Sequence, residues 1–163
     1  MTASDFIIRE IIRKDNLEIA NIVRKVIVEM GAPKVGTAYQ DKALDDLYSA
    51  YNKERAIYYV IEHDGQIVGG GGISQLDNFE GNVCELQKMY FLPIARGKGL
   101  GSKLISLCLA KAKKFEFDEC YLETMPYMKA ARKLYAKNGF TEIEGPMGDT
   151  CHHSCDVWMI KKL

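Results

Sequence analysis

The sequence predicts a mixed α/β fold in which a sheet of about seven strands carries helices on both faces. Short apolar runs alternate with segments whose apolar residues recur at helical spacing, in the order β-α-α-β-β-β-α-β-α-β-β. This order combines hairpins with helical crossovers, so the sheet is expected to be mixed. The chain has 163 residues, 47% of them apolar, and shows no repeat or long linker. We therefore expect a single domain over residues 1–163.

The N-terminal part of the chain predicts one strand followed by two helices. Residues 6–12 are rich in isoleucine and predict the first strand. Asp15 and Asn16 then offer an N-cap for a helix that continues to about Met30, where Gly31 stops it. Helical spacing resumes over residues 39–52, which predicts the second helix.

A hairpin is predicted next, because residues 56–61 and 66–69 flank a tight turn. The turn contains Asp64 and Gly65, a pair that supplies the positive φ angles such a turn needs. The third strand continues through four consecutive glycines, residues 69–72. A bulge or close backbone packing explains them better than a ligand site, and no helix follows that would make them a phosphate loop.

The C-terminal half alternates strands with helices. Strands are predicted at residues 83–92 and 120–124, and helices at residues 99–114 and 129–137, the last closed by Asn138 and Gly139. Residues 140–143 and 156–160 complete the set as the last two strands.

Charge and composition exclude several classes of function. The 22 basic and 22 acidic side chains cancel, so no broad positive field favours nucleic acid or an anionic membrane. Charges interrupt the apolar residues near the N-terminus, so we expect neither a secretory signal nor a spanning helix, and a cytoplasmic protein. The odd number of cysteines, five, favours free thiols.

A glycine-rich turn joins the fourth strand to its helix and has the chemistry of an anion site. Glycines at 97, 99 and 101 let a ligand approach the backbone, where unpaired amides at the helix start carry positive charge. The sequence fits neither a Walker loop nor a dinucleotide fingerprint, which require other glycine spacings. It therefore predicts a diphosphate site of another kind; an ordinary glycine-rich turn is the alternative.

Two motifs at this point resemble the GNAT superfamily of N-acetyltransferases. The segment Arg96-Gly97-Lys98-Gly99-Leu100-Gly101 matches the R/Q-x-x-G-x-G/A loop that binds acyl-coenzyme A in this family. Residues 131–140 are similar to the A-x-x-L-Y-x-K-x-G-F segment, at the expected distance downstream. With the element order, the resemblance spans nearly the whole chain, and it implies the family's acyl-CoA N-acyltransferase fold with a largely antiparallel sheet.

The resemblance implies that acetyl-coenzyme A lies between the fourth and fifth strands, which separate in this family. Met89 and Phe91 would pair with the pantetheine arm through their backbone, with Tyr90 between them. Residues at the turn and helix start would bind the pyrophosphate: Arg96, Gly97, Lys98, Gly99, Leu100, Gly101 and Ser102. One position departs from the family, because Met128 stands where an asparagine is frequent.

Transfer of an acetyl group to an amine needs a base and benefits from an acid. Glu85 lies eleven residues before Arg96, the spacing of the catalytic glutamate in several family members, so it resembles the general base. It would act directly or through a water; a solvated glutamate paired with Gln87 or Lys88 is the alternative. Tyr135 matches the family tyrosine that protonates the leaving thiolate and also touches the cofactor; the alternative is a core tyrosine.

The segment Cys151-His152-His153-Ser154-Cys155 contains residue types that bind zinc. A loop entering the last strand does not easily place four ligands on one tetrahedron, and no distant ligand pair accompanies them, so we expect no metal. In the family this loop borders the acceptor pocket, so His152 or His153 would contact substrate; solvated histidines are equally compatible with the sequence.

The resulting hypothesis is an N-acetyltransferase that moves an acetyl group from acetyl-CoA to a primary amine by direct attack in a ternary complex. A non-catalytic acyl-CoA binding domain is the alternative. The sequence leaves the acceptor open, with a small molecule favoured, and a homodimer is compatible with it. No role is assigned to Asp41, Asp45 and Asp46, because their spacing is typical of the solvent-exposed face of a helix.

Overall fold

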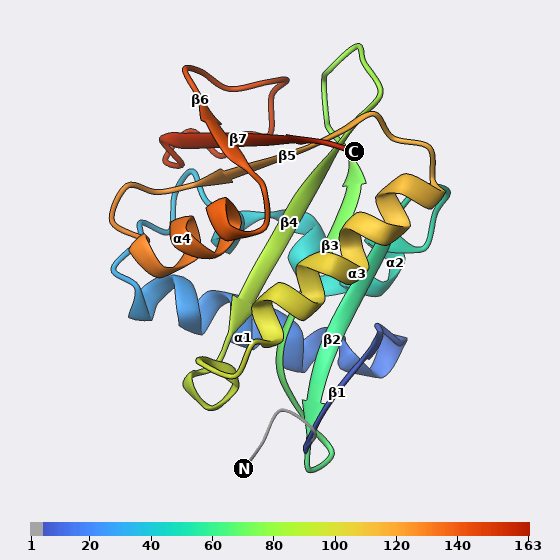
Figure 1. Cartoon of the computed structure of the whole chain (residues 1–163). Helices are drawn as coiled ribbons and strands as arrows, with labels where there is room; N and C mark the ends of the chain where they lie inside the picture. Colours follow the sequence, from blue (N-terminus) through green and yellow to red (C-terminus); the bar gives the residue numbers. More distant parts are fainter. Residues whose placement is uncertain (1–4) are drawn as a thin grey trace.

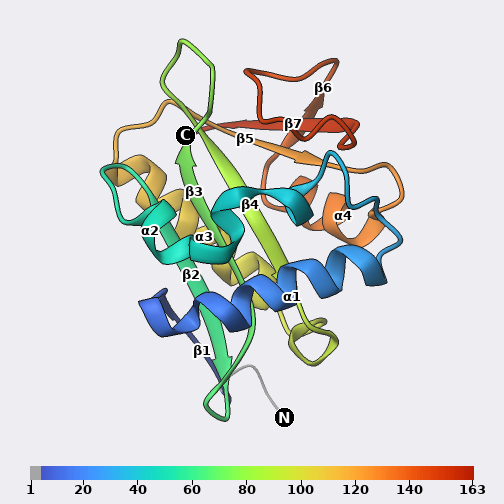
Figure 2. The same ribbon diagram turned by 180° about the vertical axis from the view of Figure 1, so that it is seen from behind.

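A computed structural model describes residues 5–163 as one sheet flanked by helices on both faces (Figures 1 and 2). Seven strands lie in the order β1-β2-β3-β4-β5-β7-β6. Their bounds are Phe6–Glu10 (β1), Ile57–His63 (β2), Gln66–Gln75 (β3), Val83–Phe91 (β4), Glu119–Thr124 (β5), Thr141–Ile143 (β6) and Val157–Lys162 (β7). The expected fold class is confirmed, and the strands and helices follow one another along the chain in the expected order.

Within residues 5–163, four α-helices cover the sheet. They are α1 (Asn16–Glu29), α2 (Leu47–Tyr51), α3 (Leu100–Lys114) and α4 (Lys129–Lys137). Helix α3 crosses one face, in front of β2 and β3 in Figure 1, while α1 and α2 cover the opposite face, which Figure 2 turns to the viewer. Each face has its own core, with Leu104 and Ile105 of α3 fully buried in one and Val23 and Ile27 of α1 in the other.

The strand pairing opens the sheet at its centre. All neighbouring strands are antiparallel except β4 and β5, which run parallel. This pairing covers three positions and stops at Glu85 and Tyr121, although β4 continues to Phe91. Beyond Glu85 the two strands diverge, and β5 leaves β4 at a wide angle in Figure 1. Among residues 5–163, no strand lies beside the backbone of β4 on that side.

The glycine-rich stretch of β3 serves close packing, as expected. The ring of Tyr58 lies against Gly70 and Gly72, where a Cβ would come within 2.8 Å and 2.7 Å of ring carbons. The Tyr58 hydroxyl donates to the carbonyl of Lys88 at 2.7 Å. Lys88 has a φ of 49°, and the register between β3 and β4 shifts beside it, between Gly70 and Gly72. The glycines thus make room for a bulge that shapes β4 where it leaves β5.

Gly72→Ala is expected to reduce the free energy of unfolding by about 1–3 kcal/mol, because its methyl group would overlap the backbone carbonyl of Ile57 on the adjacent strand. Gly145→Ala is the matched control, since a Cβ there meets nothing within 4 Å. Urea unfolding of both variants checks this, and equal stability would show that β3 does not need a glycine at 72.

Two local expectations were wrong. The helix expected over residues 39–52 is broken into the 3-10 turns Ala38–Gln40 and Lys42–Asp46 and the single helical turn of α2. Asp15 does not cap α1 with its side chain; its carboxylate binds the Arg9 guanidinium at 2.8 Å and the Ile12 amide at 2.8 Å. The Arg9 guanidinium and the Ile12 amide compete with the first amides of α1 for this carboxylate, so the capping hydrogen bond that the sequence pattern predicts does not form.

Two other expectations, the hairpin turn and the free thiols, are met. Asp64 and Gly65 have φ values of 50° and 76°, as the predicted hairpin turn requires. All five cysteines are free thiols. Within residues 5–163, no helix has both the length and the hydrophobicity to cross a bilayer.

Candidate functional site

A cavity of about 620 Å³ lies where β4 and β5 separate. Its walls come from the end of β4, the turn before α3, the first residues of α3, and α4 with the segment that precedes it. Size and position suit a long, thin ligand that would enter beside the unpaired backbone of β4.

One end of the cavity is a helix start with free amides. Gly99 is the N-cap residue of α3, with a φ of 76°, and the first helical hydrogen bond runs from the Lys103 amide to the Gly99 carbonyl at 3.1 Å. Within residues 5–163, no protein acceptor is found for the amides of residues 97–102. A cluster of unpaired amides at the positive end of a 15-residue helix is a suitable binding site for a pyrophosphate.

Arg96 holds the turn and offers a further donor. Its Nε donates to the Phe91 carbonyl at 2.9 Å, and its Nη1 pairs with the carboxylate of Glu29 at 2.7 Å. The remaining nitrogen, Nη2, is buried and has no hydrogen-bond partner within the described part of the chain. Because Arg96 also lines the cavity, an anionic ligand there would satisfy a donor that the protein leaves unpaired.

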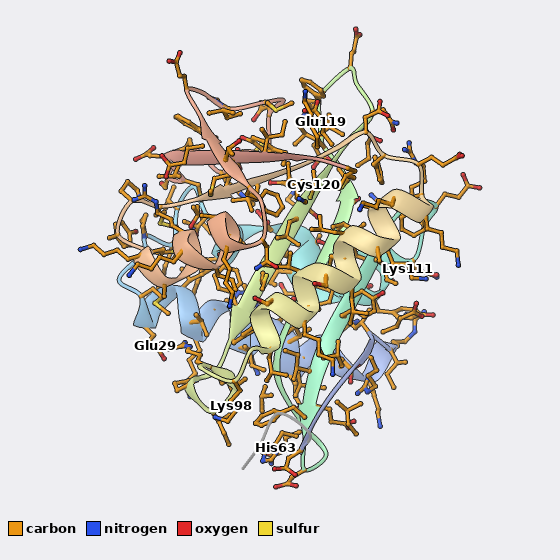
Figure 3. All side chains as sticks on the ribbon, in the orientation of Figure 1. Glu29, His63, Lys98, Lys111, Glu119 and Cys120 are labelled. Atoms are coloured by element: carbon orange, nitrogen blue, oxygen red, sulfur yellow. The ribbon has the colours of Figure 1, made fainter. Side chains whose placement is uncertain are left out.

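The other expected residues of the turn differ in what they present. Gly97, Gly99, Gly101 and Ser102 line the cavity. The side chain of Leu100 is buried in the core, so its amide is what faces a ligand. The ammonium of Lys98 lies 5.7 Å from the Phe6 ring and does not line the cavity. Figure 3 shows Lys98 at the end of the molecule that also carries His63.

Gly101 has a second reason to be glycine. A Cβ there would lie 2.7 Å from a methyl group of Leu134 on α4, whereas a Cβ at Gly99 would meet nothing within 4 Å. Ser102 accepts a hydrogen bond from the Asn138 amide at 3.2 Å, which also ties α3 to the end of α4. Substitution at Gly101 would therefore disturb helix packing as well as the loop, and Gly99 is the cleaner position to test.

The expected pantetheine segment and acid lie along the same cavity. Met89, Tyr90 and Phe91 line it at the unpaired end of β4, and Tyr135 lines it from α4. Tyr135 is 9% exposed, and burial raises its pKa to about 12, with a further contribution from Cys155. The phenol therefore keeps its proton at neutral pH and is able to donate it. Met128 also lines the cavity and accepts from the Thr124 hydroxyl at 3.6 Å.

Glu85 lies just beyond the wall of this cavity, at the last position of β4 that pairs with β5. Its side chain is 3% exposed, and burial raises its pKa to about 7. The Gln87 side chain donates a hydrogen bond to it at 2.7 Å. The alternative interpretation, a solvated glutamate paired with Gln87 or Lys88, is therefore right about the Gln87 contact, but Glu85 is buried rather than solvated. Lys88 pairs instead with Asp41 at 3.0 Å. Because Glu85 does not line the cavity, it would exchange protons with a ligand through a water.

The carboxylate that lines the cavity at this end is Glu123 of β5, which sequence reasoning missed. It accepts hydrogen bonds from the hydroxyls of Tyr121 and Thr150. One acidic or imidazole atom each of Glu85, Glu123 and His152 lies within 4.8 Å of the others. Glu123 lies two positions after Tyr121 on the same strand, so both side chains point to the same face of the sheet. This is a weak signal for a site residue, because the ordinary alternation of a strand also places polar residues at such positions.

His152 comes from the loop before β7 and is held by Asp41. Its Nε2 lies 2.9 Å from both carboxylate oxygens of Asp41. Burial disfavours the charge on each, but the hydrogen bond between them prevails, so the pKa of His152 is raised and that of Asp41 is lowered. Asp41 is therefore part of the site, whereas Asp45 pairs with Arg24 and Asp46 caps α2. Of the loop residues considered for zinc, Cys151 is exposed and Cys155 is buried.

An open parallel strand pair beside a helix start with free amides defines the acyl-CoA N-acyltransferase class, and comparison with known proteins agrees. The model of the Acetyltransferase (GNAT) family matches residues 25–140. An uncharacterized N-acetyltransferase of Escherichia coli, YjgM, is 42% identical over 158 residues, which are 96% of this chain and 95% of that protein.

Solved structures show the same fold. A GNAT-family acetyltransferase from Staphylococcus aureus superposes with a TM-score of 0.83 at 23% identity, over 97% of this chain and 99% of that one. A phosphinothricin acetyltransferase from Sinorhizobium meliloti, in complex with acetyl-CoA, superposes with a TM-score of 0.76 at 18% identity, over 98% and 89%. This chain belongs to the GNAT family and is an acyltransferase.

Proposed function

We propose that the protein transfers an acetyl group from acetyl-CoA to a primary amine by direct attack in a ternary complex. The observation that carries the proposal is the cavity that joins the amide-lined start of α3 to Tyr135 and Glu123. Its anion-binding end suits the pyrophosphate of the carrier, and its far end holds the acid Tyr135 and the carboxylate of Glu123, with the base Glu85 just beyond the wall. The acetyl-CoA bound to the phosphinothricin acetyltransferase supports the choice of donor.

Each residue then has a chemical role. Amides of residues 97–102 and the free nitrogen of Arg96 bind the pyrophosphate, and the backbone of Met89 and Phe91 binds the arm. Glu123 binds the incoming ammonium at the cavity wall. Glu85 removes its proton through one water, since an alkyl ammonium must lose a proton before it attacks. The Phe91 amide meets the developing oxyanion, and the Tyr135 phenol protonates the departing thiolate. No metal takes part.

The proposal is tested by following free thiol with acetyl-CoA and a panel of amines: alkyl monoamines, diamines, amino acids, aminoglycosides and peptides. We expect thiol release that depends on the acceptor, matched by an equal amount of acetylated amine in the mass spectrum. Binding of CoA without release for any member of the panel would instead support the non-catalytic alternative, an acyl-CoA binding domain.

Tyr135→Phe is expected to lower kcat by roughly tenfold to a thousandfold while the dissociation constant for CoA stays within about twofold, because only the proton donor is removed. The matched control is Tyr59→Phe, a tyrosine buried in the same core that does not line the cavity. Steady-state kinetics and calorimetry check this. A kcat unchanged by Tyr135→Phe would leave that residue as a packing tyrosine.

A further inference from the structure

The position of Glu85 raises a question about where its proton goes. Under the proposed function, each turnover leaves one proton on this carboxylate. The side chain is 3% exposed and lines neither cavity of the site. The cavity is filled by substrates during the reaction, so the proton needs another exit before the next turnover.

Hydrogen bonding fixes which nitrogen of His152 is free. Nε2 lies 2.9 Å from both oxygens of Asp41, whose pKa is held low by His152 and Lys88 in spite of burial. A carboxylate only accepts hydrogen bonds, so Nε2 carries a hydrogen. Nδ1 is therefore the atom that gains and loses a proton. It faces Glu123 at 3.8 Å, and one ring nitrogen of His152 lies within 4.8 Å of a carboxylate oxygen of each of Glu85 and Glu123.

A second cavity, of about 290 Å³, starts at His152. It is lined by the loop that precedes β7 and by Trp158, and it shares Glu123 and Cys155 with the larger cavity. His152 is 16% exposed, lines this second space and has a ring nitrogen within 4.8 Å of a carboxylate oxygen of the buried Glu85. The imidazole is thus in place to connect them.

We infer that His152, oriented by Asp41, carries the proton from Glu85 to solvent through the second cavity. The O–H bond of the protonated Glu85 breaks, its electron pair stays on the carboxylate, and a bridging water passes the proton to Nδ1 of His152. The resulting imidazolium then loses that proton to water in the second cavity. Glu85 and His152 are both returned to their starting forms, so nothing else is consumed.

The charges around His152 suit this transfer. Asp41 and Glu123 lie on its two sides and stabilise the imidazolium. The positive charge of Lys88 disfavours the imidazolium, but this charge is balanced by the Asp41 carboxylate, which lies 3.0 Å from the Lys88 ammonium. Glu85 has a pKa of about 7 and that of His152 is raised above its usual value, so the imidazole is able to accept the proton that the carboxylic acid releases.

A purely structural role for His152 is the competing explanation, because its bond to Asp41 joins the loop before β7 to the segment after α1. The same two segments are also joined elsewhere. The Ser154 amide donates to the Gly36 carbonyl at 3.0 Å, and its hydroxyl donates to the Val35 carbonyl at 2.8 Å. The loop therefore keeps two anchors when the imidazole is replaced.

The test is His152→Gln, assayed with and without added imidazole. Glutamine retains a polar side chain but does not titrate. We expect kcat to fall about 10- to 100-fold in a weakly buffered solution, and to recover with increasing imidazole until the rescue saturates. Pyrazole has nearly the same shape but is a far weaker base, so it should not restore activity. The pH dependence of kcat should lose the limb that belongs to His152.

The control is His63→Gln, a buried histidine beside Asp64 at the far end of the molecule (Figure 3), which should keep full activity. Full activity of His152→Gln would overturn the inference. So would a loss that imidazole does not reverse and that leaves the shape of the pH profile unchanged, because this is the signature of a structural role.

The inference rests on the proposed function, and its failure is separable from that of the function. If Glu85→Gln is inactive while His152→Gln is fully active, the assignment of Glu85 as the base is supported and the exit route through His152 is wrong. If neither variant affects acceptor-dependent thiol release, the assignment of Glu85 falls as well. CoA affinity, measured by calorimetry, should be unchanged in both variants and shows that each one folds.

Discussion

Gly99→Val is expected to weaken the binding of acetyl-CoA by about 100-fold or more, which corresponds to about 2.7 kcal/mol. Gly99 lines the cavity and has a φ of 76°, a conformation that strains a β-branched residue by about 1–2 kcal/mol or more. A Cβ there points into open space, with no protein atom within 4 Å. The valine would therefore occupy the room above the amides and also tilt the amides themselves.

Gly65→Val separates these effects from general backbone strain. Gly65 also has a φ of 76°, and a Cβ there would meet no atom within 4 Å, but it lies in the hairpin between β2 and β3, away from the cavity. Calorimetric titration should show the affinity lost in Gly99→Val and kept in Gly65→Val, with similar thermal stability. Equal CoA affinity in the two variants would contradict the assignment of the loop.

Glu85→Gln should lower kcat by about 10²- to 10⁴-fold, because the reaction loses the group that takes the proton from the amine. In the unmodified protein, kcat/KM should rise as the pH increases through about 7, since the carboxylate is the active form and burial sets its pKa there. The variant should lack this rise. A rise at the same pH in Glu85→Gln would assign the base to another group.

The same substitution should stabilise the fold at high pH. In the unfolded chain Glu85 loses its proton near 4.5, whereas in the folded protein it keeps the proton until about 7. Its contribution to the free energy of unfolding therefore falls between these two pH values. Glutamine carries no charge, so Glu85→Gln should be more stable above pH 7, by up to about 3 kcal/mol. Urea unfolding at pH 5 and 8 measures the difference, which should be small at the lower pH.

The parts of the fold predicted from the sequence are those set by local signals. Alternating apolar residues, the turn at Asp64 and Gly65, and the glycines before α3 each act over a few residues, and the structure has the expected elements there. In the segment 39–52, local signals do not predict the structure correctly. Its apolar spacing is helical, but 3-10 turns take half of it, and Asp41 within it binds His152 and Lys88.

The part of the site around Glu123 and His152 was harder to predict because it depends on long-range contacts. Asp41 and His152 are 111 residues apart, and the sequence around each residue contains no motif that predicts their contact. Glu123 looks like one polar position of a strand, yet it is the carboxylate that lines both cavities. Lys98 lies in the expected loop, but its side chain turns toward Phe6, since an aromatic face on β1 is within reach.

The central claim is that the amides of residues 97–102 are left free for a pyrophosphate. Amide hydrogen exchange resolved to single residues tests it most directly, in the free protein and with saturating CoA. The account predicts rapid exchange of these amides in the free protein and marked protection when CoA is bound. Amides already protected without CoA, or still exchanging rapidly with CoA bound, would contradict it.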